Sequence, residues 1–128
     1  MTDISDIPAR AQQFLKTYIK SVWQLELIVF LKSSGKAWNC QDISKALYMS
    51  SDKNIETVLQ NFERAGVVQS SQEPQKTYIY APTNTEMRDS VEQALKAYSE
   101  RRVQVVNLIY TAPMQYFSDA FKLREEDR

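Results

Sequence analysis

The stretch "NCQDISKALYMSSDKNIETVLQNFERAGVV", residues 39–68, decides the fold. Its pattern predicts a short helix over about 40–48, a turn, and a second helix over about 51–65. Asn39 is a good N-cap for the first helix, and Gly66 ends the second. The second helix has a core face of apolar residues at helical spacing: Ile55, Val58, Leu59 and Phe62. Two short helices joined by a tight turn are typical of a helix-turn-helix.

Two further helices are expected before this stretch. Pro8 suits the first turn of a helix over about 8–20, because its missing N–H has no helical partner there. The segment "SVWQLELIVFLKSSG", residues 21–35, predicts a helix that is apolar nearly all round. Gly35 ends this helix, which should lie in the middle of the core.

A hairpin and two more helices are expected after the stretch. The β-rich runs "VVQSS" and "TYIYAP" flank the polar "QEPQK" and predict a β-hairpin. The capping-box pattern "TNTE", residues 83–86, opens a helix over about 85–111, which would be nearly 40 Å long. Pro113 ends it, and a short helix over about 114–123 follows. The expected units are an N-terminal helix (1–20), a central domain (21–82) and a C-terminal helical part (83–128).

The composition narrows the range of functions. The chain has 128 residues, no histidine, one cysteine and a formal net charge of zero. Without histidine it lacks the commonest general base and metal ligand, and it shows no catalytic carboxylate pair and no Gly-rich phosphate loop. We therefore expect neither an enzyme nor a cofactor or metal site. The most apolar run, residues 22–31, is too short to span a bilayer and is interrupted by Gln24 and Glu26, so we expect a cytoplasmic protein without membrane contact.

The central part, about 21–82, resembles the bacterial winged helix-turn-helix transcription regulators of the MarR/PadR-like kind. The resemblance rests on the opening stretch, above all on its "FERAGVV" ending, and on the wing-like "SSQEPQKTYIYAP". It implies a mainly α fold with a small β-hairpin wing and a long C-terminal helix. The stretch "YSERRVQVVNLIY…FSDAFKLR" is similar to the tail of an uncharacterised bacterial group of such proteins.

The predicted reading helix must be judged by face, because it holds three acids and only two bases. Helical geometry places Asp52, Glu56 and Glu63 together on one flank. We expect these acids to point away from phosphates, paired with Lys45 or Lys53. The fully exposed side contains no acid. The predicted DNA contacts of this helix and its N-terminus are Ser50, Ser51, Lys53, Asn54, Thr57, Gln60, Asn61 and Arg64.

The predicted wing, residues 71–77, adds Gln75 and Lys76 as candidates for backbone or minor-groove contact. Two readings stay open besides DNA contact. The polar side of the reading helix could be an ordinary solvated face, or it could bind a protein.

The predicted long helix carries apolar residues near a seven-residue repeat, on more sides than one small domain can easily cover. This favours a homodimer, although packing inside one chain is the alternative. The predicted contacts are Val91, Leu95, Tyr98, Val105, Val106 and Ile109. Arg102 falls on the same stripe, and a buried arginine needs a partner. That partner would be an acidic side chain, a helix-end carbonyl, or a bound anion or small-molecule effector near the dimer interface.

These observations predict a homodimeric, DNA-binding transcription regulator that places helix 51–65 in the major groove of double-stranded DNA. The alternative is a winged-helix adaptor that binds another protein and no DNA. The zero net charge favours that alternative, because phosphate neutralisation supplies much of the affinity for DNA.

Overall fold

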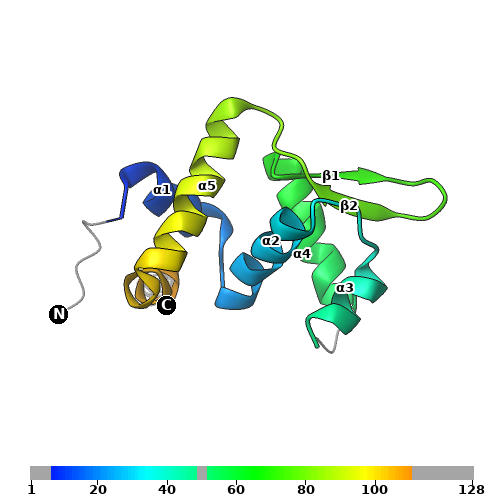
Figure 1. Ribbon diagram of the computed structural model, residues 1–128, viewed down its shortest axis with the longest axis horizontal. Coiled ribbons are helices and arrows are strands. Elements are labelled where there is room, and N and C mark those ends of the chain that lie inside the picture. Colours follow the sequence, from blue (N-terminus) through cyan, green and yellow to red (C-terminus); the bar gives the residue numbers. More distant parts are fainter. Residues whose placement is uncertain (1–6, 49–51, 111–128) are drawn as a thin grey trace, which may run out of the picture.

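The computed structural model describes residues 7–48 and 52–110. The protein is mainly helical, with one small antiparallel sheet (Figure 1). The elements are α1 (Ala9–Tyr18), α2 (Val22–Ser34), α3 (Cys40–Ala46), α4 (Asp52–Ala65), β1 (Val68–Ser71), β2 (Thr77–Tyr80) and α5 (Thr85–Glu100). Residues 102–110 form a further helix. The short helix expected over about 114–123 lies outside the described residues.

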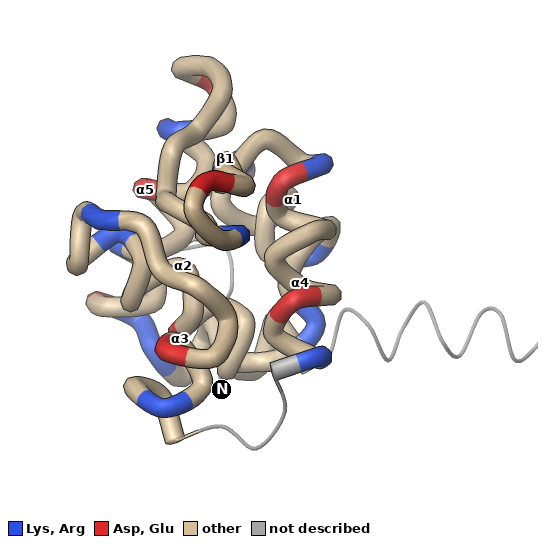
Figure 2. The backbone as a smooth tube through the Cα atoms, turned by 90° about the vertical axis from the view of Figure 1, so that its right-hand side faces the viewer, with Lys and Arg blue, Asp and Glu red and all other residues tan. Residues whose placement is uncertain are grey.

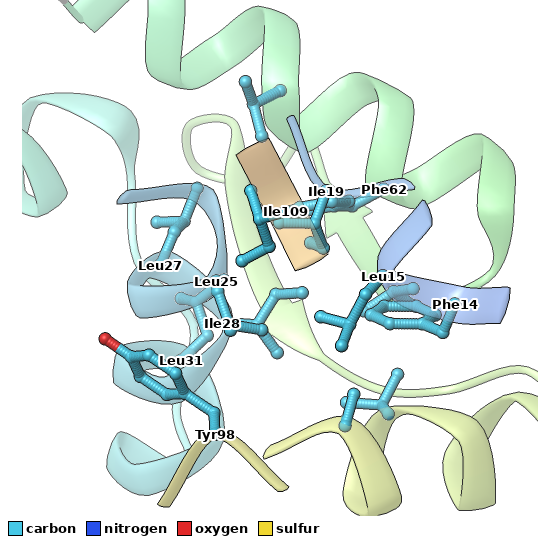
Figure 3. Close-up of a cluster of buried hydrophobic side chains, with 14 of the residues drawn as sticks. Phe14, Leu15, Ile19, Leu25, Leu27, Ile28, Leu31, Phe62, Tyr98 and Ile109 are labelled. Atoms are coloured by element: carbon cyan, nitrogen blue, oxygen red, sulfur yellow. The ribbon is translucent and has the colours of Figure 1, made fainter. Parts of the chain in front are cut away.

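The elements are arranged around α2. At one end α1 packs beside α5, and at the other end α3 packs on α4, while the hairpin of β1 and β2 extends outward (Figure 1). Four residues of α2 are fully buried, as expected for a central helix: Leu25, Leu27, Ile28 and Leu31. Figure 3 shows these side chains in one cluster with Leu15 of α1, Phe62 of α4 and Tyr98 of α5. In the described part of the chain, no helix is long and apolar enough to cross a membrane.

Local capping chemistry explains where the helices begin and end. The Asn39 side chain accepts a hydrogen bond from the Asp42 amide at 2.7 Å, so the predicted N-cap of α3 is confirmed. Gly35 ends α2 in the left-handed conformation, with a φ of 67°.

The N-cap of α5 differs by one residue from the expected capping box. Asn84 is the cap, because its side-chain oxygen accepts from the Met87 amide at 2.7 Å. Thr83 is held elsewhere: its amide donates to the Gly66 carbonyl at 2.9 Å, which ties the segment before α5 to the turn after α4. A tertiary contact therefore decides which of two neighbouring polar residues becomes the cap.

The hairpin is present as predicted, with Val68 opposite Tyr80 and Ser71 opposite Thr77. Its second strand also pairs on the other edge, with the loop between α2 and α3. Trp38 and Tyr78 exchange two backbone hydrogen bonds, of 2.9 and 2.8 Å, in an isolated bridge. The hairpin is therefore anchored to the chain segment that leads into α3.

The expectation of one continuous helix over about 85–111 is wrong. The helix α5 ends at Glu100, and Arg101 departs from helical geometry with a φ of −135° and a ψ of 55°. The chain resumes as the 102–110 helix, where Val105 and Ile109 are fully buried. The break lets Ile109 join the same cluster as Ile19 and Phe62 (Figure 3).

Candidate nucleic-acid interface

The helix α4 has one buried and one exposed side. Its core face is as predicted: Ile55 and Leu59 are fully buried, and Phe62 is 1% exposed. The opposite side carries six polar residues, of which Gln60 is half-buried and the others are exposed. We call them the α4 polar stripe: Lys53, Asn54, Thr57, Gln60, Asn61 and Arg64.

Two hydrogen bonds organise this stripe. The Thr57 hydroxyl donates to the Lys53 carbonyl at 3.0 Å, so its proton is used within the helix. The threonine methyl group and the hydroxyl lone pairs remain for an external partner. At the far end of the helix, the Arg64 guanidinium donates to the Asn61 side-chain oxygen. The stripe thus offers two cations and several amide groups, a set that can contact both phosphates and base edges.

Two acids of the α4 flank, Glu56 and Glu63, lie toward the hairpin. The carboxylate of Glu63, which is half-buried, accepts a hydrogen bond from the Ser70 hydroxyl of β1 at 2.6 Å. Glu56 is also half-buried and lies near Tyr78 of β2, whose pKa is raised mainly by burial and to a smaller extent by the charge of Glu56. The expected pairing of the flank with Lys45 or Lys53 is wrong for Glu63, whose hydrogen-bond partner is a hydroxyl of the neighbouring strand.

The hairpin tip is nearly neutral. Gln75 is exposed, whereas the Lys76 ammonium lies 5.6 Å from the centroid of the Tyr78 ring and is half-buried. Glu73, also at the tip, is exposed. Figure 2, which marks the charged residues along the backbone, shows acidic as well as basic residues on this side of the described chain. The predicted contacts at Gln75 and Lys76 are therefore weaker candidates than the α4 polar stripe.

The turn between α3 and α4 contains a residue that sequence reasoning did not single out. Tyr48 is 95% exposed and has a φ of 56°, in the left-handed region that aromatic residues avoid. This exposed side chain lies at the end of the turn next to the α4 polar stripe, where an external partner can reach it. The sequence gives no signal for this exposure, because tyrosine occurs both in cores and on surfaces. Ser50 and Ser51, the expected phosphate contacts, lie outside the described residues.

The residues predicted to form a dimer contact belong largely to the core of the single chain. Val91, Val105 and Ile109 are fully buried, and Tyr98 is 4% exposed. Leu95 and Val106 are half-buried. The more exposed apolar residues of this region are Val103 (65%) and Tyr110 (47%), both on the 102–110 helix.

Arg102 is exposed, not buried as its place on the apolar stripe suggested. Its guanidinium stacks on the Tyr98 ring, 4.3 Å from the centroid, and donates to the Tyr98 hydroxyl at 3.1 Å. That hydroxyl in turn donates to the Glu26 carboxylate of α2. Burial, followed by the hydrogen bond to Glu26, raises the pKa of Tyr98 to about 12, so the phenol stays protonated at neutral pH.

Comparison of the chain with protein families, with curated proteins and with solved structures found no match. Function is therefore inferred from the residues and their geometry alone.

Proposed function

We propose that this protein is a winged-helix regulator of transcription, acting in the bacterial cytoplasm, that inserts α4 into the major groove of DNA. The observation that carries the proposal is the α4 polar stripe, an exposed helix face without any acid. The flanking carboxylate of Glu63 is turned toward the hairpin and hydrogen-bonded there. A helix of this kind can approach phosphates on one side only, which gives it a preferred docking direction.

The order of the elements supports a winged-helix assignment. Three helices, α2 to α4, are followed by a hairpin, and the last two helices pack on each other across a short turn. The isolated β-bridge between Trp38 and Tyr78 also supports this assignment, because it anchors the hairpin to the segment that leads into α3. In this arrangement the second helix of the pair and the hairpin lie on one side of the domain, where both can reach DNA.

The stripe divides into two parts by its position on α4. Lys53, Asn54 and Thr57 are in the N-terminal half, which meets the bases in helix-turn-helix complexes. Gln60, Asn61 and Arg64 are nearer the C-terminus and suit the phosphate backbone. With about two or three cations per chain near DNA, the affinity should fall with salt with a log–log slope of about −2 to −3 per chain.

The test is a fluorescence-anisotropy titration of duplex DNA at about 50 mM salt, where non-specific electrostatic binding emerges. We expect Lys53→Ala and Arg64→Ala each to weaken binding and to reduce the salt slope by about 1. Glu56→Ala, on the acidic flank of the same helix, is the matched control and should not weaken binding. Absence of any DNA binding at this salt concentration would remove the proposal.

A protein-binding adaptor is the second candidate. It is favoured by the zero net charge of the chain and by Tyr48, whose ring is 95% exposed on the turn beside α4. The two candidates differ in their response to Tyr48→Ser. The DNA regulator should keep most of its non-specific affinity, which depends on cations, whereas an adaptor should lose its partner contact at this residue.

A homodimer would present two copies of α4 to a pseudo-palindromic site. Since most of the expected contact residues are covered within the chain, the two-fold contact would use Val103 and Tyr110, together with the exposed part of Val106. Sedimentation of the full chain at micromolar concentration tests this. A dimer that dissociates in a Val103→Asp variant supports the contact, and a monomeric parent protein excludes it.

A further inference from the structure

A pocket of about 400 Å³ opens between α2, the end of α5 and the start of the 102–110 helix. We call it the α2–α5 pocket. It lies apart from the α4 polar stripe, because none of its residues comes from α4 or the hairpin. Its lining residues are Glu26, Val29, Lys32, Ser33, Leu95, Tyr98, Ser99 and Arg102.

Within this pocket, the Arg102 side chain is positioned by Tyr98. Its guanidinium lies over the Tyr98 ring, with 4.3 Å to the centroid, and donates to the Tyr98 hydroxyl at 3.1 Å. Tyr98 is only 4% exposed and is itself fixed by its hydrogen bond to Glu26. A guanidinium has five N–H donors, so further donors remain for a ligand after the one used by Tyr98. An arginine fixed in this way loses little side-chain entropy when it binds an anion.

Lys32 supplies a second cation to the same pocket, and it is exposed. The ion pair found within the described residues, between Arg10 and Asp89 at 3.7 Å, involves neither cation of the pocket. The one carboxylate of the pocket, Glu26, already accepts the Tyr98 hydroxyl. The lining therefore has an excess of positive charge, with Lys32 and Arg102 contributed by different helices.

We propose that the α2–α5 pocket binds a small organic anion. One carboxylate or phosphate group would lie between Lys32 and Arg102, where it can accept charge-assisted hydrogen bonds. A short apolar body would pack on Val29 and Leu95, which form the apolar part of the lining. The volume is within the range of small-molecule sites. This inference does not depend on DNA binding, since it concerns a separate surface of the molecule.

The experiment is a calorimetric titration of the full chain with four probes: hexanoate, hexyl phosphate, hexanol and inorganic phosphate. We expect one or both amphiphilic anions to bind, and the comparison of hexanoate with hexyl phosphate tells which head group is preferred. Hexanol lacks the charge and inorganic phosphate lacks the apolar body, so both should bind much more weakly. Methyl resonances of Val29 and Leu95 should shift on binding.

Variants test the two cations. Arg102→Gln and Lys32→Gln should each weaken binding about tenfold or more, since each removes a hydrogen bond to a charged group. Lys96→Gln, an exposed lysine of α5 outside the pocket, is the matched control and should bind like the parent protein. Circular dichroism checks the fold of Arg102→Gln, and Lys32→Gln decides the matter where that variant does not fold.

Three results would overturn the inference. The first is no binding of either amphiphilic anion. The second is binding that survives Lys32→Gln unchanged or that Lys96→Gln weakens equally. The third is inorganic phosphate binding as tightly as hexyl phosphate, which would mean that the apolar lining contributes nothing.

Discussion

The turn between α4 and β1 depends on a glycine whose replacement has a calculable cost. Gly66 has a φ of +88°, and a Cβ added there would lie 2.5 Å from the Oγ1 atom of Thr83. Thr83 cannot retreat with its backbone, because its amide donates to the Gly66 carbonyl at 2.9 Å. We therefore predict that Gly66→Ala strains the junction between α4 and the hairpin.

The magnitude has two parts. Left-handed backbone costs an alanine about 1–2 kcal/mol relative to glycine. Moving the Thr83 side chain out of its rotamer adds about 0.5–1.5 kcal/mol. The sum of about 1.5–3.5 kcal/mol is a large fraction of the stability of a typical small domain.

Gly35 provides the matched control. It also has a positive φ, of +67°, but an added Cβ would meet nothing within 4 Å. Gly35→Ala should therefore lose only the conformational part, about 1–2 kcal/mol. Urea denaturation followed by circular dichroism measures both variants, with unchanged m-values as the sign that the two-state analysis holds.

A double-mutant cycle isolates the steric part. In the Gly66→Ala background, Thr83→Ala removes the clashing hydroxyl and should restore about 1 kcal/mol, beyond its effect in the parent protein. The reasoning fails if Gly66→Ala costs no more than Gly35→Ala. It also fails if Thr83→Ala recovers nothing.

Three further effects are expected. Asn84→Ala should lower the free energy of unfolding by about 1 kcal/mol in urea denaturation, and no loss would mean that this residue does not cap α5. Burial is the main cause that raises the pKa of both Tyr80 and Tyr98 to about 12, so the stability that these neutral phenols contribute is complete below pH 10 and is lost as the pH rises toward 12. Urea midpoints across this range should fall less steeply for Tyr98→Phe, and an identical fall would contradict the assignment. Ser70→Ala should cost about 1 kcal/mol and weaken DNA binding, because the freed Glu63 carboxylate could then turn toward phosphates, and unchanged anisotropy titrations would refute this role.

Much of the local structure could be predicted from the sequence, because its signals act over a few residues. Asn39 and Gly35 mark helix boundaries through side-chain capping and left-handed backbone, which need no distant partner. The apolar spacing of α4 identified its core face, and with it the exposed stripe opposite. The hairpin followed from two β-rich runs around a polar tip.

The break at Arg101 could not be predicted in this way. Neither proline nor glycine occurs in residues 98–110, and the apolar repeat continues through the break. No local signal marks the break, and the burial of Val105 and Ile109 after it depends on contacts with elements distant in sequence. After the break Arg102 is exposed, whereas Val105 and Ile109 are buried within the chain. The sequence had predicted that Val105 and Ile109 would contact a second copy of the chain.

The candidate site shows the same division. The sequence by itself determined which residues of α4 share a face, because the helical period fixes their relative directions. Only the tertiary structure decided that Glu63 meets Ser70 of β1, that Tyr98 holds Arg102 in a pocket that Lys32 also lines, and that Tyr48 is left exposed. The physical reason is that a periodic pattern predicts which face of an element must be buried and which must be solvated. Which other element covers the buried face depends on contacts between segments far apart in the chain.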